Sequence, residues 1–193
     1  MPQDMSFLDD YLVRPDPQAA RLGATVSGID QTGATVETRV VTERALTLYL
    51  NAQEIVTMMT IGDHPDALAL GYLLNQNMLK PADRVTAVDY DEELEVVVVR
   101  TPQRTDFEQK LKKKTLTSGC AQGTVFGDLM EKFEDVRLSS TARIRTSWLA
   151  ALTRKINTAP SLYLEAGAIH GCVLCKESTP VCYTEDVGRH NAL

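Results

Sequence analysis

The sequence is short of cysteine, tryptophan and histidine, with four, one and three of these residues in 193 positions. The chain is long enough to bury a core, so it does not need its four cysteines as disulfide staples. The N-terminal run MPQDMSFLDDYLVRPDP is acidic and has no apolar stretch after a positive start, so it is not a secretory signal. No apolar run approaches the length that spans a bilayer. We therefore expect a cytoplasmic protein whose cysteines are thiols, metal ligands or catalytic groups.

The net charge of −6 argues against a general nucleic-acid binder. A general nucleic-acid binder is usually basic, so we expect no nucleic-acid partner. An acidic total still allows a local basic patch, and four of the five residues at 110–114 (KLKKK) are lysines.

The first hundred residues predict an α+β fold. ATVSGID (24–30) and TVETRVVTE (35–43) indicate short strands, and 44–61 indicates a hairpin around the turn NAQ. The period then changes to that of a helix over 64–79, with Asp63 as a capping residue and Pro65 in the first turn. Residues 83–101 predict a strand, an acidic turn and a second strand.

The second half is less regular. Residues 101–116 are polar and basic, as in a linker or loop, and TVFGDLMEKF (124–133) predicts a short helix that Gly127 weakens. Apolar residues at helical spacing predict a longer helix over 140–159. We divide the chain into an irregular leader (1–22), an N-terminal α+β part (23–105) and a second part (106–193). The second part carries the loop around Cys120, which is called the cysteine loop below.

Cys120 lies in the run KLKKKTLTSGCAQGTVFG, between glycines and after the lysines. Nearby positive charge lowers the pKa of a thiol, and the thiolate is the reactive form. The glycines allow close approach of a partner, and such a thiol can hold a sulfur atom as a persulfide. The alternative is a small residue in a turn, with the lysines as a solvated face.

The run HGCVLCKESTPVC holds the other three cysteines. His170, Cys172, Cys175 and Cys182 could make a zinc site, or the Cys-x-x-Cys pair could be redox-active. The apolar neighbours indicate a strand, however, which would put Cys172 and Cys175 on opposite faces as small core residues. The zinc nucleobase deaminase pattern is not met, because its glutamate and second cysteine pair are missing.

The final run YTEDVGRHNAL crowds five chemically active residues around one glycine. We expect Asp186 to cap a helix that begins near Gly188, and Arg189 and His190 to reach an anion. The alternative is an ordinary helix start with ion pairs. The sequence stops inside this expected helix, which indicates truncation.

Four segments together resemble the formate dehydrogenase accessory sulfurtransferases, the FdhD family. They are MMTIGDHPDALALGYLL, TSGCAQG, GAIHGCVLC and EDVGRHNAL, and the resemblance covers roughly residues 40–193. It implies an α/β fold with a cytidine-deaminase-like core, incomplete here at the C-terminus because the family continues beyond RHNA. It also implies a homodimer.

The activity that the resemblance implies is sulfur transfer. A cysteine desulfurase loads sulfur onto a loop cysteine, and the protein passes it to the bis-molybdopterin guanine dinucleotide cofactor that formate dehydrogenase needs. Cys120 occupies the position of that cysteine and is the expected catalytic residue. Many members carry two cysteines on this loop. Gln122 and Gly123 stand near the second position here, so transfer through one thiol is favoured.

The pyrophosphate groups of such a cofactor need a local positive surface. The residues expected to form it are Lys112, Lys113, Lys114, His170, Arg189 and His190, and no structural metal is expected. Two other interpretations remain open: a zinc-binding or cysteine-redox protein using residues 170–182, and a non-enzymatic chaperone that holds the cofactor.

Overall fold

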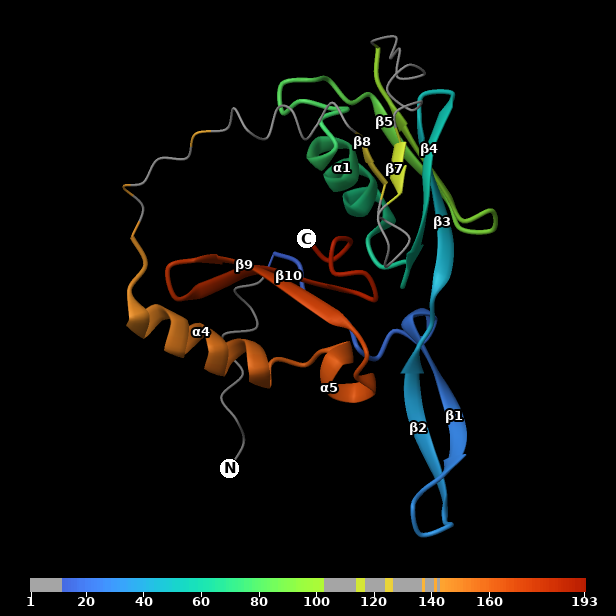
Figure 1. The fold of residues 1–193 in the computed structure, drawn as a ribbon, viewed down its shortest axis with the longest axis vertical. Helices are drawn as coiled ribbons and strands as arrows, with labels where there is room; N and C mark the ends of the chain where they lie inside the picture. The colour runs from blue at the N-terminus through green and yellow to red at the C-terminus, as the bar shows by residue number, and fades with distance from the viewer. Residues whose placement is uncertain (1–11, 103–113, 117–123, 127–136, 138–140, 142) are drawn as a thin grey trace. The chain divides into compact units, whose positions relative to one another are not determined.

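A computed structural model describes residues 12–102, 114–116, 124–126, 137, 141 and 143–193. The chain forms two compact units (Figure 1). Unit 1 combines Met1–Thr42 with Ser139–Leu193, and unit 2 is Glu43–Leu138. Unit 1 is therefore discontinuous in the sequence, because its two segments flank unit 2.

Unit 2 contains a four-stranded sheet in which the order is β4-β3-β6-β5. The strands are β3 (Arg44–Leu50), β4 (Gln53–Thr60), β5 (Ala87–Asp91) and β6 (Val96–Arg100). The β3–β4 and β5–β6 pairs are antiparallel hairpins, which confirms both sequence predictions. The β3–β4 turn has Asn51 at φ 55°, a left-handed conformation that asparagine tolerates. β3 and β6 are parallel, and this pairing joins the two hairpins into one sheet.

One face of this sheet is covered by α1 (Pro65–Asn75), and the core of unit 2 lies between them. Every second residue of β3 points to this face, because side chains alternate along a strand. Leu46, Leu48 and Leu50 are all 0% exposed. They share a cluster with Ala69 and Leu73 of α1.

The ends of α1 differ from the prediction of a helix over 64–79. The residue before the helix is His64, at φ 50°, so the expectation that Asp63 caps it is wrong. Pro65 does occupy the first turn, as predicted. The helix stops at Asn75 because Asn77 is left-handed at φ 51° and the amides of the next two residues both turn back to the Leu73 carbonyl.

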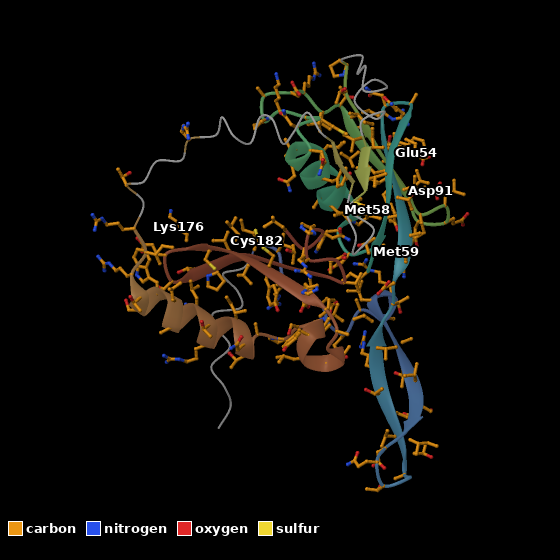
Figure 2. All side chains as sticks on the ribbon, viewed as in Figure 1. Glu54, Met58, Met59, Asp91, Lys176 and Cys182 are labelled. Carbon is orange, nitrogen blue, oxygen red and sulfur yellow. The ribbon has the colours of Figure 1, made fainter. Side chains whose placement is uncertain are left out.

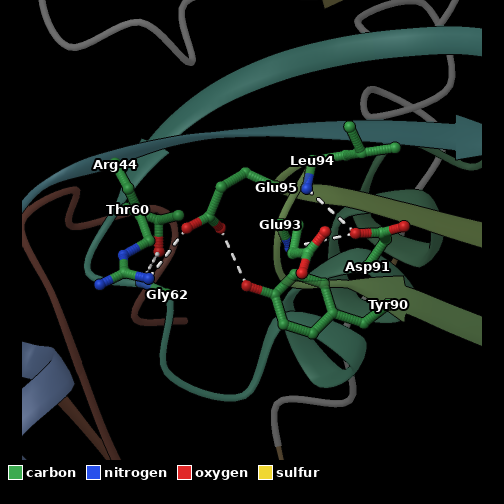
Figure 3. A network of polar contacts seen from close by, with 8 residues as sticks. All are labelled: Arg44, Thr60, Gly62, Tyr90, Asp91, Glu93, Leu94 and Glu95. Carbon is green, nitrogen blue, oxygen red and sulfur yellow. Dashed lines mark hydrogen bonds and ion pairs between the residues drawn. The ribbon is translucent and has the colours of Figure 1, made fainter.

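A polar network ties the start of β3 to the acidic β5–β6 turn (Figure 3). The Arg44 guanidinium donates to Glu95 Oε1 at 2.9 Å, and the Tyr90 hydroxyl donates to Glu95 Oε2 at 2.9 Å. Asp91 accepts two backbone amides of the turn, each at 3.0 Å. The carboxylates of this acidic stretch thus have specific structural partners.

Unit 2 also contains a short antiparallel pair, β7 (Lys114–Leu116) and β8 (Thr124–Phe126). The prediction of a helix over 124–133 is therefore wrong at 124–126. Thr124, Val125 and Phe126 are β-branched or aromatic, and such residues favour a strand once a partner strand is available. Residues 127–133 lie outside the described part of the chain.

The first segment of unit 1 forms a hairpin from β1 (Gly23–Ile29) and β2 (Thr35–Val41), the two strands predicted from the sequence. Asp30 closes its turn by accepting hydrogen bonds from Thr32 and from the Ala34 amide. These bonds lower the pKa of the Asp30 carboxyl, with the Thr32 hydroxyl as the largest cause. Before β1, the described leader residues include a 3-10 turn, η2 (Ala20–Leu22), in which Leu22 is 0% exposed.

The second segment of unit 1 contains two helices followed by a two-stranded ribbon. These are α4 (Thr146–Thr158), α5 (Leu162–Ala166), β9 (His170–Lys176) and β10 (Thr179–Asp186). α4 confirms the predicted helix but begins six residues later, after the extended Arg145. The Lys155 ammonium of α4 donates to the Ser178 carbonyl in the β9–β10 turn at 3.1 Å.

The mixed α/β class expected from the sequence is confirmed. The division at 22/23 and 105/106, the cytidine-deaminase-like core and its incomplete C-terminus remain predictions. Among the described residues, no helix is both long enough and apolar enough to cross a bilayer.

Candidate functional site

The cysteine loop falls largely outside the described residues. Cys120, Lys112 and Lys113 all lie in segments that the structure does not describe, and Lys114 is described only as the first residue of β7. The role of Cys120 as the persulfide carrier, and that of the neighbouring lysines in binding an anion, therefore remain predictions from the sequence.

The other three cysteines lie on the β9–β10 ribbon, where they are free thiols of intermediate exposure (Figure 2 labels Cys182). Cys172 pairs with Thr184, Cys175 with Pro180, and Cys182 with Leu174. This register gives the three thiols three different neighbours. The described residues include no group of three or more His, Cys, Asp and Glu side chains that could hold a metal ion. The four residues of the zinc interpretation are all described, and they do not form such a group.

Burial raises the pKa of the Cys175 thiol, and the neighbouring Cys172 raises it further. The thiol contacts the Val173 carbonyl at 3.6 Å. A raised pKa leaves less thiolate at neutral pH, and the thiolate is the nucleophile. Cys175 is therefore poorly suited to attack a sulfur donor.

The run EDVGRHNAL forms the end of β10 and a turn after it. Asp186 is 3% exposed, and its Oδ1 accepts hydrogen bonds from the Gly188 amide and from Asn191 Nδ2, both at 2.8 Å. The Asn191 and Ala192 amides donate back to the Gly188 carbonyl at 2.9 and 3.1 Å. The expected helix beginning near Gly188 is absent from these described residues. Two bonds to one carboxylate oxygen hold a compact turn instead, a role typical of aspartate.

Glu185, the preceding carboxylate, is 5% exposed and points to another part of unit 1. It accepts the backbone amides of Leu162 and Tyr163 at 2.7 and 3.1 Å, and the Tyr183 hydroxyl at 3.3 Å. It thereby holds the first turn of α5 against the end of β10. Sequence reasoning gave Glu185 no role, because nothing local links residues 23 positions apart.

Gly171 makes room for this arrangement. A Cβ atom at Gly171 would lie 2.9 Å from the Tyr183 ring, closer than real Cβ contacts allow. Tyr183 is 5% exposed and belongs to the small core of this ribbon. The glycine in the run HGC is therefore explained by the packing of an aromatic ring on the neighbouring strand.

Three of the expected anion-binding residues come to one end of the ribbon. His170 opens β9 and is the cross-strand partner of Asp186, which closes β10. Arg189 and His190 follow in the turn, and His170, Arg189 and His190 are all exposed. An arginine and two histidines together offer several hydrogen-bond donors to an anion, while the two carboxylates of the same run are buried.

A family model, the FdhD/NarQ family, matches residues 41–193. The chain belongs to the FdhD/NarQ family. This confirms the resemblance inferred from the four segments, and the family match includes the Cys120 loop and the β9–β10 ribbon.

Named relatives agree with this membership. The sulfur carrier protein FdhD of Bacillus subtilis is 29% identical over 163 residues, which are 82% of this chain and 61% of that protein. The protein of the same name from Wolinella succinogenes is 27% identical, over 80% of this chain and 54% of that protein. The chain therefore spans about three-fifths of the length of the FdhD proteins it matches.

A solved structure supports the fold. The crystal structure of a formate dehydrogenase accessory protein from Desulfotalea psychrophila superposes with a TM-score of 0.59 at 19% identity, over 88% of this chain and 63% of that one. At this identity the similarity is one of fold.

Proposed function

We propose that this protein is a sulfurtransferase that carries sulfur during the maturation of formate dehydrogenase. The observation that carries the proposal is the family match over residues 41–193, together with relatives named sulfur carrier protein FdhD. The Desulfotalea psychrophila protein that shares the fold is named a formate dehydrogenase accessory protein. A cysteine desulfurase is the proposed donor, and the proposed acceptor is the bis-molybdopterin guanine dinucleotide cofactor, bound as substrate.

Cys120 is the proposed sulfur carrier. Its thiolate attacks the outer sulfur of the donor's persulfide, a new S–S bond forms on Cys120, and the donor cysteine leaves as a thiolate. The positive charge of the preceding lysines favours the attacking thiolate. Cys172, Cys175 and Cys182 are weaker candidates, because they lie half-buried on strands and the pKa of Cys175 is raised.

The cofactor carries pyrophosphate groups, and the proposed contacts are the exposed positive residues. His170, Arg189 and His190 share one end of the ribbon in unit 1. The other proposed contacts, Lys112, Lys113 and Lys114, precede Cys120 in the sequence and would act beside its thiol. We further propose a homodimer, as the resemblance implies.

The test is intact-mass analysis after incubation with a cysteine desulfurase and cysteine. We expect the wild type to gain sulfur that a reductant removes, and Cys120→Ala to gain none. Cys182→Ala is a matched control that keeps Cys120 and should load normally. Equal loading of Cys120→Ala would move the carrier to the ribbon thiols. No loading of the wild type would refute the sulfur-carrier role and favour a protein that only holds the cofactor.

A further inference from the structure

The turn after β10 combines a buried carboxylate with exposed side chains that can donate hydrogen bonds. Asp186 is buried and holds the turn through the Gly188 amide and Asn191 Nδ2. Arg189 and His190, which lie between these two contacts, are exposed. The same oxygen atom of Asp186 thus fixes the positions immediately before and after the two exposed side chains.

The turn is also fixed from two further directions. A Cβ atom at Gly188 would lie 3.0 Å from the Asn191 side chain, so these two residues are already in close contact. The Thr184 hydroxyl of β10 donates to the Ala192 carbonyl at 2.5 Å, which folds the end of the turn back onto the strand. These contacts restrict the backbone that carries Arg189 and His190, and a backbone segment that is already ordered loses less entropy when it binds a ligand.

We propose that Asp186 is a positioning residue: it holds Arg189 and His190 in the arrangement that binds a diphosphate group. This rests on the proposed function, in which these two side chains contact the pyrophosphate of the substrate. Asp186 acts through the turn and does not touch the anion itself, because its carboxylate is buried and bonded to donors of the turn.

A positioning role for Asp186 and simple electrostatics predict opposite changes in anion affinity when the carboxylate is removed. A carboxylate close to an anion site repels the anion, so removing its charge alone should tighten binding. If Asp186 positions the turn, Asp186→Ala should weaken binding even though a negative charge has been removed. Asp186→Asn removes the charge but keeps a carbonyl oxygen that can accept both hydrogen bonds, so its binding should equal or exceed that of the wild type.

The experiment is an NMR titration of the 193-residue chain with inorganic pyrophosphate, with far-UV circular dichroism to confirm that each variant is folded. We expect Asp186→Ala to bind about tenfold more weakly, the effect of losing two hydrogen bonds that organise the turn. Asn191→Ala removes the other end of one of these bonds and should weaken binding about threefold. It also provides a second variant if Asp186→Ala does not fold.

Glu185→Gln is the matched control. Glu185 is the neighbouring buried carboxylate, but it holds α5 and not the turn. Its loss should lower stability and leave pyrophosphate binding unchanged, which separates a positioning effect from general destabilisation.

Two results would overturn the proposal, and they differ. If Arg189→Ala weakens binding while Asp186→Ala binds as tightly as the wild type or tighter, the anion site stands and the positioning role is wrong. If the wild type does not bind pyrophosphate, or Arg189→Ala and His190→Ala bind like the wild type, the proposed anion site fails and the positioning role fails with it.

Discussion

Tyr72 carries a buried hydroxyl for which the described residues offer no hydrogen-bond partner. Its side chain is 7% exposed and belongs to the core between α1 and the four-stranded sheet. Within the described part of the chain, the hydroxyl has no hydrogen-bond partner, and neither does Gln76 Oε1 one helical turn later. A buried polar group without a partner costs about 1–3 kcal/mol, whereas a phenylalanine ring fills the same space without that cost. We therefore expect Tyr72→Phe to stabilise unit 2 by about 1 kcal/mol at neutral pH.

The difference in the free energy of unfolding between Tyr72→Phe and the wild type should grow at alkaline pH. Burial raises the pKa of Tyr72 from 10.0 to about 12. Above pH 10 the unfolded chain loses the proton of the Tyr72 hydroxyl while the folded chain keeps it, so the free energy of unfolding of the wild type falls as the pH rises towards 12. Two pKa units correspond to about 2.7 kcal/mol. The gap between Tyr72→Phe and the wild type should widen by about 2–3 kcal/mol over this range.

The assay is urea unfolding at a series of pH values, followed by two signals. Circular dichroism reports both units, while fluorescence of Trp148, the single tryptophan, reports unit 1. Tyr72→Phe should shift the unfolding transition seen by circular dichroism to higher urea and leave the transition seen by Trp148 fluorescence unchanged. Tyr163→Phe is the control, because Tyr163 is 60% exposed on α5 and its loss should change neither signal. A Tyr72→Phe variant less stable than the wild type at neutral pH would show that the hydroxyl does have a partner, and would refute the reasoning.

Three further outcomes are expected. Glu185→Gln should lower the stability of unit 1 by about 2 kcal/mol in urea unfolding, against a change within about 0.5 kcal/mol for Glu37→Gln on the exposed strand β2; equal effects would contradict the buried role. The midpoint pH of Cys175 alkylation, measured by mass spectrometry, should be higher than that of a free cysteine peptide, and Cys172→Ser should lower it partly. A midpoint below that of the free peptide would contradict the raised pKa of Cys175. Gly62→Ala should destabilise unit 2 by about 1–3 kcal/mol, because Gly62 has φ 72° and a Cβ there would lie 2.7 Å from the Arg44 side chain; unchanged thermal unfolding would show that the backbone relaxes.

The elements predicted correctly are those with a strong local signal. The hairpins at 44–61 and 83–101 have alternating apolar residues around turn-forming ones, and this pattern acts over a few residues. The helix at 65–75 was predicted to run four residues too far. Its apolar residues continue to Leu79, but the left-handed Asn77 redirects the chain. The apolar pattern does not distinguish a continuing helix from a turn that still buries its side chains.

The errors and omissions have a different physical origin. The strand at 124–126 depends on pairing with β7, and the parallel β3–β6 contact joins strands about fifty residues apart. In the candidate site, the sequence indicates the residue types of EDVGRHNAL but not that Glu185 and Asp186 have different structural partners. Glu185 binds an α-helix that begins 23 residues earlier, so the local pattern carries no information on its partner.

The discontinuity of unit 1 has a consequence for synthesis. The Arg39 guanidinium lies 3.6 Å from the Glu165 carboxylate, and Val13 forms a bridge with Cys182. At about 5–20 residues per second, a ribosome needs roughly 7–28 seconds to extend the chain from residue 42 to residue 182. During that interval β1 and β2 have left the ribosome without these partners, and a lone two-stranded hairpin is only marginally stable in water. Unit 2 is contiguous and can fold during the same interval, so the N-terminal segment is the part of the nascent chain that waits longest for its contacts and stays longest within reach of chaperones and proteases.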